Sequence, residues 1–522
     1  MRITPYSKSD TSIFKGFAIL SICLHNFFHH IANSPGENEF YFFSYCIDGF
    51  LHLLKTHPAD FINIIYSYLG HFGVQLFIFI SGYGLTKAMQ KKEKSWGQFM
   101  VDRMKKLYPL VITALIVYSL SMIILHNKYV WNSDLTEMSY KIGFIHTLLP
   151  NSGLSLCGPW WFFGLIFQLY LIFPILYRLI KKHQVKSLII ILLISYTWIF
   201  LSMYQFQGIK NISLMQNSPG HLPEFCLGMF FAFSENKKFS NIFLPVSIIA
   251  FILGNFYKVF FPFTFIAITI IAIFAFDYIK RIPYKTGILK KIFVYFGNIS
   301  MMMFVTNGFL RSPFIKLSEV LNTPLGHIVA ALLFLTTVCG VSIASMKLYE
   351  LLLSAFSKIN IPTNRISVSV SRIFQLFFVT ISIYILYYFS CFISPKNEKE
   401  LLTKEMYVAN KEILENDTYT TVTSINFDKN YKKLKIEGSL DISNYDTSKD
   451  FPLLILDING KLWHKYVIPK ELNTQNGKKF IFSYEYYTPF IETLKGGYLK
   501  MYFWNTTKTH SQFNNTNLSI KY

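Results

Sequence analysis

Long apolar segments alternate with short basic segments over about the first 395 residues of the chain. Most apolar segments run for roughly 18 to 22 residues, the length that crosses the hydrocarbon core of a bilayer. Helices are expected at about 12–30, 64–86, 107–125, 158–178, 187–203, 221–233, 242–257, 261–279, 297–311, 326–346 and 372–393. The pattern predicts a mainly α polytopic membrane protein with about 10–11 transmembrane helices.

Two connecting segments are longer than the others. Residues 31–62 are polar and aromatic, and residues 126–158 form a long loop that contains His126 and His146. No small-residue cleavage site follows the first apolar segment, so we interpret it as the first transmembrane helix and not as a cleavable signal.

The last part of the chain changes to a two-residue alternation of apolar and polar positions. Segments such as LKIEGSLDI and FIFSYEYY are separated by Asn-Gly turn signals. This predicts an all-β, sandwich-like domain over 396–522, after a transmembrane domain over 1–350 and a cytoplasmic loop with one more helix over 351–395. Its two histidines, His464 and His510, are isolated, which favours a non-catalytic binding or spacer module.

Composition supports the membrane assignment. The 522 residues are 52% hydrophobic and 18% aromatic. The net charge of +21 does not indicate nucleic-acid binding, because the cations lie mostly in short loops between apolar segments. If the N-terminus is cytoplasmic, inside segments carry roughly 24 Lys and Arg and outside loops about five or six, as the positive-inside rule expects. Eleven spans would then place the β-rich domain outside the cell.

The cysteines indicate neither a zinc site nor a disulfide framework, because they form no Cys-x-x-Cys pair. A Cys46–Cys157 bridge is conceivable only if both loops are external. We expect no metal and no bound cofactor. The six cysteines are Cys23, Cys46, Cys157, Cys226, Cys339 and Cys391.

The first helix contains the most informative polar pattern, KGFAILSICLHNFFHH from Lys15 to His30. Lys15 and His25 are separated by about 15 Å along a helix, or half the hydrocarbon thickness. His25 and His29 are four residues apart and share one face. A histidine within an apolar helix is a functional candidate, although backbone or water at the helix end could also satisfy it.

Other polar residues lie in or beside the later helices, and each has a structural alternative. Ser81, Gly82 and Gly84 could serve helix packing, and Gln168 could join helices by hydrogen bonds. Trp160 and Trp161 could form an interfacial aromatic belt, and Glu224 could be a helix N-terminal charge. The remaining candidates are His71, Gln75 and Asn307.

Together these residues suggest a polar path through the membrane. Cations at the inner mouth, Lys15, Arg103, Lys105 and Lys106, suit a phosphorylated donor such as a coenzyme A thioester. His25 suits removal of a hydroxyl proton, and the outer mouth would hold His29, His71 and Glu224. Glu224 could orient the imidazole or bind an acceptor sugar. Such a path would move an acyl group from inside to a hydroxyl outside.

Five segments in order resemble the membrane acyltransferase-3 family, bacterial O-acyltransferases of surface glycans, over about residues 10–350. They are KGFAILSICLHNFFH, GVQLFIFISGYGL, FMVDRMKKLYPL, WWFFGLIFQLYLIFPIL and LPEFCLGMFFAF. The resemblance implies transfer of an acyl group, commonly acetyl from acetyl-CoA, to a cell-envelope carbohydrate. It also implies a multi-pass protein of the bacterial cytoplasmic membrane, with Lys15 as the first-helix basic residue and His25 as the catalytic histidine.

Two positions depart from the family pattern. Many members have His eleven residues after the basic residue, where this chain has Asn26. Many also have His seven residues after the Ser of a Gly-x-x-Ser segment, where Asn307 follows Gly297 and Ser300. A second histidine is therefore either dispensable or supplied by His29 or His71.

The catalytic prediction is His25 with Glu224, with Lys15, Arg103 and Lys105 at the donor. Asn26, His29, His71, Gln168, Trp161 and Asn307 are expected at the acceptor or in support. A transporter or flippase of a lipid-linked saccharide could use the same polar path. A glycan-binding surface protein with a helical anchor is a third class, although eleven spans exceed what an anchor needs.

Overall fold

The computed structural model describes residues 1–126, 133–149, 152–204, 213–281 and 287–359. It also describes the strands between 403 and 521 with residues 427 and 497. The chain divides into two compact units, Met1–Thr380 and Ile381–Tyr522. The boundary falls outside the described residues, so the division at 350 and 396 stays a prediction.

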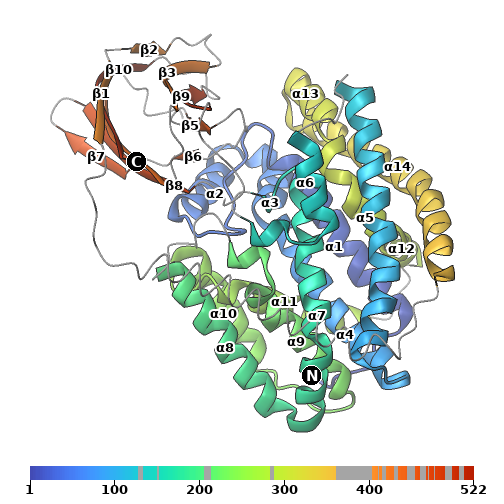
Figure 1. Ribbon diagram of the computed structural model, residues 1–522. Coiled ribbons are helices and arrows are strands. Elements are labelled where there is room, and N and C mark those ends of the chain that lie inside the picture. The colour runs from blue at the N-terminus through green and yellow to red at the C-terminus, as the bar shows by residue number, and fades with distance from the viewer. Residues whose placement is uncertain are drawn as a thin grey trace. The chain divides into compact units, whose positions relative to one another are not determined.

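The first unit is helical, and seven of its described segments are long and apolar enough to cross a membrane. Helix α5 lies beside α14 along one edge of the unit (Figure 1). The seven are α1 (Lys8–Phe28), α5 (Trp96–His126), α7 (Trp161–His183), α11 (Phe263–Arg281), α12 (Gly287–Leu310), α14 (Pro324–Lys358), and the continuous segment of η1 (Pro58–Asp60), α3 (Phe61–Leu69), η2 (Gly70–Phe72) and α4 (Gly73–Lys91).

Three helices predicted as spans do not meet the length and hydropathy expected of a membrane-crossing helix. They are α8 (Val185–Tyr204), whose apolar part is Val185–Leu201, α9 (Ser218–Phe233) and α10 (Phe243–Phe256). The 16 residues of α9 reach only about 24 Å, less than the hydrocarbon core of about 30 Å. The multi-pass character is thus confirmed, whereas the number of 10–11 spans is only partly met. The helix expected at 372–393 lies outside the described residues.

The two long loops contain helices that the apolar pattern misses. Helix α2 (Ser44–Thr56) lies within 31–62, and α6 (Ser133–Ile142) with η3 (His146–Leu148) lies within 126–158. A further short helix, η4 (Gly158–Trp160), precedes α7, and α13 (Ser312–Leu321) follows α12. These helices are too short or too polar to cross a bilayer, so a search for apolar runs does not find them.

Glycines bring two pairs of helices into backbone contact. A Cβ on Gly16 of α1 would lie 1.9 Å from the Phe293 carbonyl oxygen of α12, and one on Gly297 would lie 1.9 Å from Ser12 O. The same reciprocal arrangement joins α4 to α9 through Gly82 and Gly228, at 2.1 and 2.0 Å from opposing carbonyl oxygens. The expectation that Gly82 serves close packing is confirmed. Gly84 has no neighbour within 4 Å of such a Cβ, so for Gly84 the expectation was wrong.

Several basic loops meet on one side of the helical unit. Ile3 N–H donates to Lys237 O at 3.0 Å, and Lys280 pairs with Asp10 at 3.0 Å. Tyr83 and Lys87 both contact Glu235, at 2.7 and 2.9 Å. These contacts join the N-terminal segment, the loop after α9 and the C-terminal halves of α4 and α11.

The second unit contains strands that pair antiparallel in two sheets. One has the order β1-β10-β4-β8-β7 with β2 on β10, and the other has the order β3-β9-β5-β6. The β-rich composition of the tail is therefore confirmed, whereas face-to-face packing as a sandwich stays a prediction. The strands are β1 (Thr403–Val408), β2 (Lys411–Ile413), β3 (Tyr419–Asn426), β4 (Lys433–Ser443), β5 (Leu453–Ile458), β6 (Tyr466–Val467), β7 (Lys470–Thr474), β8 (Gly477–Tyr487), β9 (Tyr498–Trp504) and β10 (Ser511–Lys521).

Candidate functional site

The C-terminal end of α1 holds His25 against the end of α3. Because α3 ends at Leu69, its last carbonyls have no complete set of partners within the helix. The Nδ1 atom of His25 lies 3.0 Å from Ser67 O and 3.3 Å from Tyr66 O. A carbonyl can only accept, so Nδ1 carries the hydrogen and Nε2 keeps its lone pair. His25 is thus held in the tautomer that a base requires.

Gly70 makes this approach possible. A Cβ at Gly70 would lie 2.7 Å from both the His25 Cβ and Ser21 O. Only glycine therefore lets η2 pass close over α1 at this level. The same turn places His71 beside His25, with ring centroids 5.5 Å apart.

His29 and Glu37 extend the histidine group beyond the end of α1. The His25 and His29 rings are 5.2 Å apart, and His29 Nδ1 lies 2.8 Å from Glu37 Oε2. Burial alone would raise the pKa of Glu37, but the neighbouring His29 and its hydrogen bond lower that pKa to about 2. Burial and the charge of Glu37 together raise the pKa of Glu39 well above its ordinary value.

The two departures from the family pattern meet in space. Asn26 Nδ2 donates to Asn307 Oδ1 at 2.7 Å, while Asn307 Nδ2 donates to Met303 O and Phe304 O. Arg311, directly after α12, donates to Asn26 O at 3.3 Å. The pair therefore ties α1 to the C-terminal end of α12 next to His25.

A second buried polar group surrounds Glu224 in α9. Glu224 is fully buried and is the seventh residue of its helix, so it is not the N-terminal charge that we considered. His221 Nδ1 lies 3.9 Å from Glu224 Oε2, and Trp161 stacks on the His221 ring at 5.6 Å. Trp160 is also buried and donates to Val305 O, so neither tryptophan forms an interfacial belt.

The two groups are separate. The carbonyls of Ser67 and Tyr66, and not Glu224, hold Nδ1 of His25. The Phe265 ring lies 6.0 Å from both the Phe72 and the His221 ring. Neither Glu224 oxygen has a hydrogen-bond partner among the described residues, so Glu224 does not hold the His25 ring directly here, and its orienting role stays a prediction.

Gln168 has the structural role that we considered. Its amide donates to Asn217 Oδ1 at 2.7 Å and to Thr147 Oγ1 at 3.1 Å, and its oxygen accepts from Ser218 N. These bonds fix the start of α9 and η3 against α7. Gln168 therefore supports the Glu224 group through the backbone that carries it.

Several buried polar atoms near both groups have no hydrogen-bond partner among the described residues. They are both ring nitrogens of His71, both carboxylate oxygens of Glu224, Gln75 Oε1, His221 Nδ1 and the Tyr196 hydroxyl. Buried polar atoms in folded proteins are normally paired with protein, water or ligand. These unpaired polar atoms could therefore form hydrogen bonds with a bound substrate.

The predicted donor cations make separate contacts. Arg103 lies over the Phe99 and Tyr170 rings at 5.5 and 6.0 Å, and Lys105 donates to Ser357 O at 3.3 Å. Helix α1 packs mainly on α12, and α5 packs mainly on α14 and also on α12 and α7. A joint role of Lys15, Arg103 and Lys105 at the donor stays a prediction.

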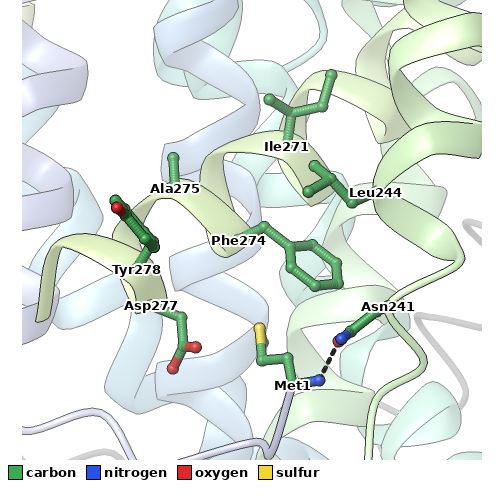
Figure 2. A pocket seen from close by; sticks show the side chains of 8 residues that line it. All are labelled: Met1, Asn241, Leu244, Ile271, Phe274, Ala275, Asp277 and Tyr278. Carbon is green, nitrogen blue, oxygen red and sulfur yellow. Dashed lines mark hydrogen bonds between the residues drawn. The ribbon is translucent and has the colours of Figure 1, made fainter. Parts of the chain in front are cut away.

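A separate pocket of about 450 Å³ lies on the side where the basic loops meet. Figure 2 shows Phe274 facing Met1, whose ammonium donates to Asn241, with Asp277 nearby. Its lining is mainly apolar and includes a carboxylate, which does not suit the phosphates of coenzyme A. None of the predicted site residues lines it.

Two residues near His25 were missed from the sequence, Glu37 and Arg311. Glu37 lies in a connecting segment that has no periodic pattern of apolar residues. Arg311 follows an apolar segment, where a cation is expected in any membrane protein. The one sequence signal for Glu37 was its separation of eight residues from His29, which is long enough for the loop to fold back onto the end of α1. One nitrogen each from His25 and His29 and one oxygen from Glu37 lie within 4.8 Å of one another.

A family profile described as an acyltransferase domain, of the acyltransferase-3 type, matches residues 12–346. No curated protein and no solved structure matches the chain. The matched region contains both buried polar groups and ends before the described strands.

Proposed function

The chain belongs to the membrane acyltransferase-3 family, and we propose that it moves an acyl group, with acetyl as the expected group, from a cytoplasmic acyl-CoA to a hydroxyl of a cell-envelope polysaccharide or glycolipid. The single observation that carries the mechanism is the bond from His25 Nδ1–H to Ser67 O. It leaves the Nε2 lone pair of a buried imidazole free to take a proton.

In the proposed reaction the acceptor hydroxyl gives its proton to His25 Nε2 as its oxygen attacks the thioester carbonyl carbon. The new C–O ester bond forms and the C–S bond to coenzyme A breaks. The leaving thiolate takes the proton from His25 and departs as free coenzyme A. Positioned proton transfer of this kind typically contributes about 10²- to 10⁴-fold to rate.

The donor and acceptor assignments rest on chemistry and position. Lys15 is half-buried on α1, about 15 Å along the helix from His25, where a thioester arm from the cytoplasm would pass. Arg103 and Lys105 are proposed to contact donor phosphates from α5, separately from Lys15. Glu224, His221 and Trp161 are proposed to bind the acceptor, because Glu224 has two unpaired oxygens.

The remaining residues have supporting roles in this proposal. Asn26 and Asn307 fix α1 against α12, His71 and His29 flank the base, and Gln168 holds the start of α9. The protein is proposed to lie in a bacterial cytoplasmic membrane with its N-terminus inside and its β-rich unit outside. That unit is proposed to bind glycan or to act as a spacer.

Mass spectrometry of surface glycan tests the function. Cells with the intact gene, a deletion and His25→Ala are compared for an alkali-labile acyl increment. We expect the increment to be lost in the deletion and reduced at least about 100-fold in His25→Ala, with the glycan amount unchanged. His52→Ala is the matched control, because His52 is an exposed histidine of α2.

Two results would contradict the proposal. Full acylation by correctly inserted His25→Ala protein would exclude His25 as the base. Loss of glycan from the surface with an unchanged acyl pattern would favour a transporter of a lipid-linked saccharide.

A further inference from the structure

We propose that His25, His29 and Glu37 form a binding site for a divalent first-row transition metal such as Zn²⁺, with His71 as the fourth ligand. This differs from the sequence, which indicated no metal site. The proposal concerns metal binding and is independent of acyl transfer.

The ligand atoms are already close together. One nitrogen of His25, one nitrogen of His29 and one oxygen of Glu37 lie within 4.8 Å of one another. Tetrahedral zinc with bonds of about 2.0–2.1 Å holds its ligands about 3.3 Å apart, so small side-chain rotations would close the site. His25 and His29 are one helical turn apart, which directs both rings to the same side of α1.

The surrounding hydrogen bonds suit metal ligation. Metal-binding histidines usually donate their other ring N–H to a carbonyl or carboxylate, which fixes the ring and the tautomer. His25 does this through Nδ1 to Ser67 O at 3.0 Å. Its Nε2 lone pair is therefore directed away from α3 and available to a metal.

His71 supplies an independent observation. Its side chain is 2% exposed, and neither ring nitrogen has a partner among the described residues. Its ring centroid lies 5.5 Å from that of His25. An imidazole buried without hydrogen bonds is costly, and coordination of a metal would satisfy one nitrogen.

The donor set selects the class of metal. Three imidazole nitrogens and one carboxylate oxygen suit zinc and similar transition metals, whereas Ca²⁺ and Mg²⁺ prefer sites made of oxygen atoms. A metal on Nε2 of His25 would occupy the lone pair that the proposed reaction needs. Zinc is therefore expected to inhibit acyl transfer, a consequence that rests on the proposed role of His25.

The test measures metal binding to purified full-length protein in detergent. After treatment with a chelator, the protein is titrated with Zn²⁺ by calorimetry, and Co²⁺ serves as a spectroscopic probe of tetrahedral geometry. We expect one Zn²⁺ per chain and a Kd at least about 10-fold weaker in Glu37→Gln and His29→Ala. His52→Ala, which removes an exposed histidine, should bind as the unmodified protein does.

The variants that remove a ligand could also disturb folding, so His71→Phe is included. It keeps an aromatic ring while removing both nitrogens, and it should change the Co²⁺ absorption spectrum. The proposal is overturned if no stoichiometric Zn²⁺ binding occurs, if Mg²⁺ competes equally well, or if Glu37→Gln and His29→Ala bind as tightly as the unmodified protein. None of these outcomes depends on acyl-transfer activity.

Discussion

At the scale of single residues, the position of His25 is defined by carbonyl groups of α3. His25 precedes by one residue the position where many family members have histidine, and that position is Asn26 here. Asn26 instead bonds Asn307, which stands at the second position that departs from the family. The two asparagines that depart from the family pattern are thus hydrogen-bonded to each other.

The Asn26–Asn307 bond predicts coupled effects of substitution. We expect Asn26→Ala and Asn307→Ala each to lower thermal stability, and the double variant to cost less than the sum by about 1 kcal/mol. The measurement is thermal unfolding of the four proteins in the same detergent. Strictly additive effects would show that the two amides do not interact.

Lys141 of α6 predicts a pH dependence of stability. Its side chain is fully buried, with Nζ donating to Gly153 O at 3.0 Å, and burial lowers its pKa from 10.5 to about 7. Between these two values the unfolded chain holds a proton that the folded chain lacks, so stability rises with pH. From pH 7 to 9 we expect a gain of about 2 kcal/mol.

Thermal unfolding of the unmodified protein and Lys141→Met checks this. The variant should lose most of the rise between pH 7 and 9, whereas Lys55→Met, at an exposed lysine of α2, should keep it. An equal rise in all three proteins would assign the dependence to another group.

Sequence could predict part of the candidate site. The helical spacing of His25 and His29 places these two side chains together, because this is a local relation. His71, Glu224 and the donor cations were grouped with His25 only by their expected depth in the membrane. Depth does not determine which helices are neighbours, so the packing of α5 on α14 and the contact of Glu224 with His221 could not be foreseen.

At the scale of helices, glycine positions determine which axes approach closely. Gly82→Ala and Gly297→Ala should each destabilise the protein by about 2 kcal/mol or more, because a Cβ would meet backbone atoms at 2.1 and 1.9 Å. Gly84→Ala is the control, since it lies in α4 with no neighbour within 4 Å of a Cβ. It should be neutral or stabilising by up to about 1 kcal/mol.

Thermal unfolding in detergent distinguishes these variants. If Gly82→Ala is as stable as Gly84→Ala, α4 and α9 do not pack through their backbones as described.

Apolar length predicted that the long helices exist but not where they end. Helices α5 and α12 begin at Trp96 and Gly287, and α14 ends at Lys358, each ten or more residues beyond the predicted bound. It did not predict α2 and α6, which are amphipathic and lie in the connecting segments. It also assigned a membrane span to α9, whose apolar sequence reflects burial among α4, α7 and α8. An apolar segment thus indicates that a helix is shielded from water, but not whether lipid or neighbouring helices shield it.

At the scale of the whole molecule, the loops separate into two sets. The N-terminal segment and the loop after α9 contact the C-terminal halves of α4 and α11, whereas His29 and Asn307 lie at the opposite ends of α1 and α12. The distribution of Lys and Arg among successive loops predicted these two sets from charge alone. The arrangement of the β-rich unit could not be predicted to the same degree, since strand order depends on contacts between distant segments.

Cysteine labelling tests the two sides. In a protein whose native cysteines are replaced by serine, Lys55→Cys should react with an impermeant maleimide in intact cells. Lys92→Cys should react only after permeabilisation; both positions are exposed. Labelling of both without permeabilisation would contradict the predicted orientation.

The glycine-mediated contacts between α1 and α12 and between α4 and α9 affect how a substrate could reach His25. Helices whose backbones already touch cannot be pressed closer, and sliding them apart would break many contacts at once. The α1–α12 and α4–α9 pairs should therefore behave as two stiff rods during turnover. An opening that admits substrate to His25 would then have to come from a segment without such contacts, such as residues 31–43, which reach the end of α1 through the Glu37–His29 hydrogen bond.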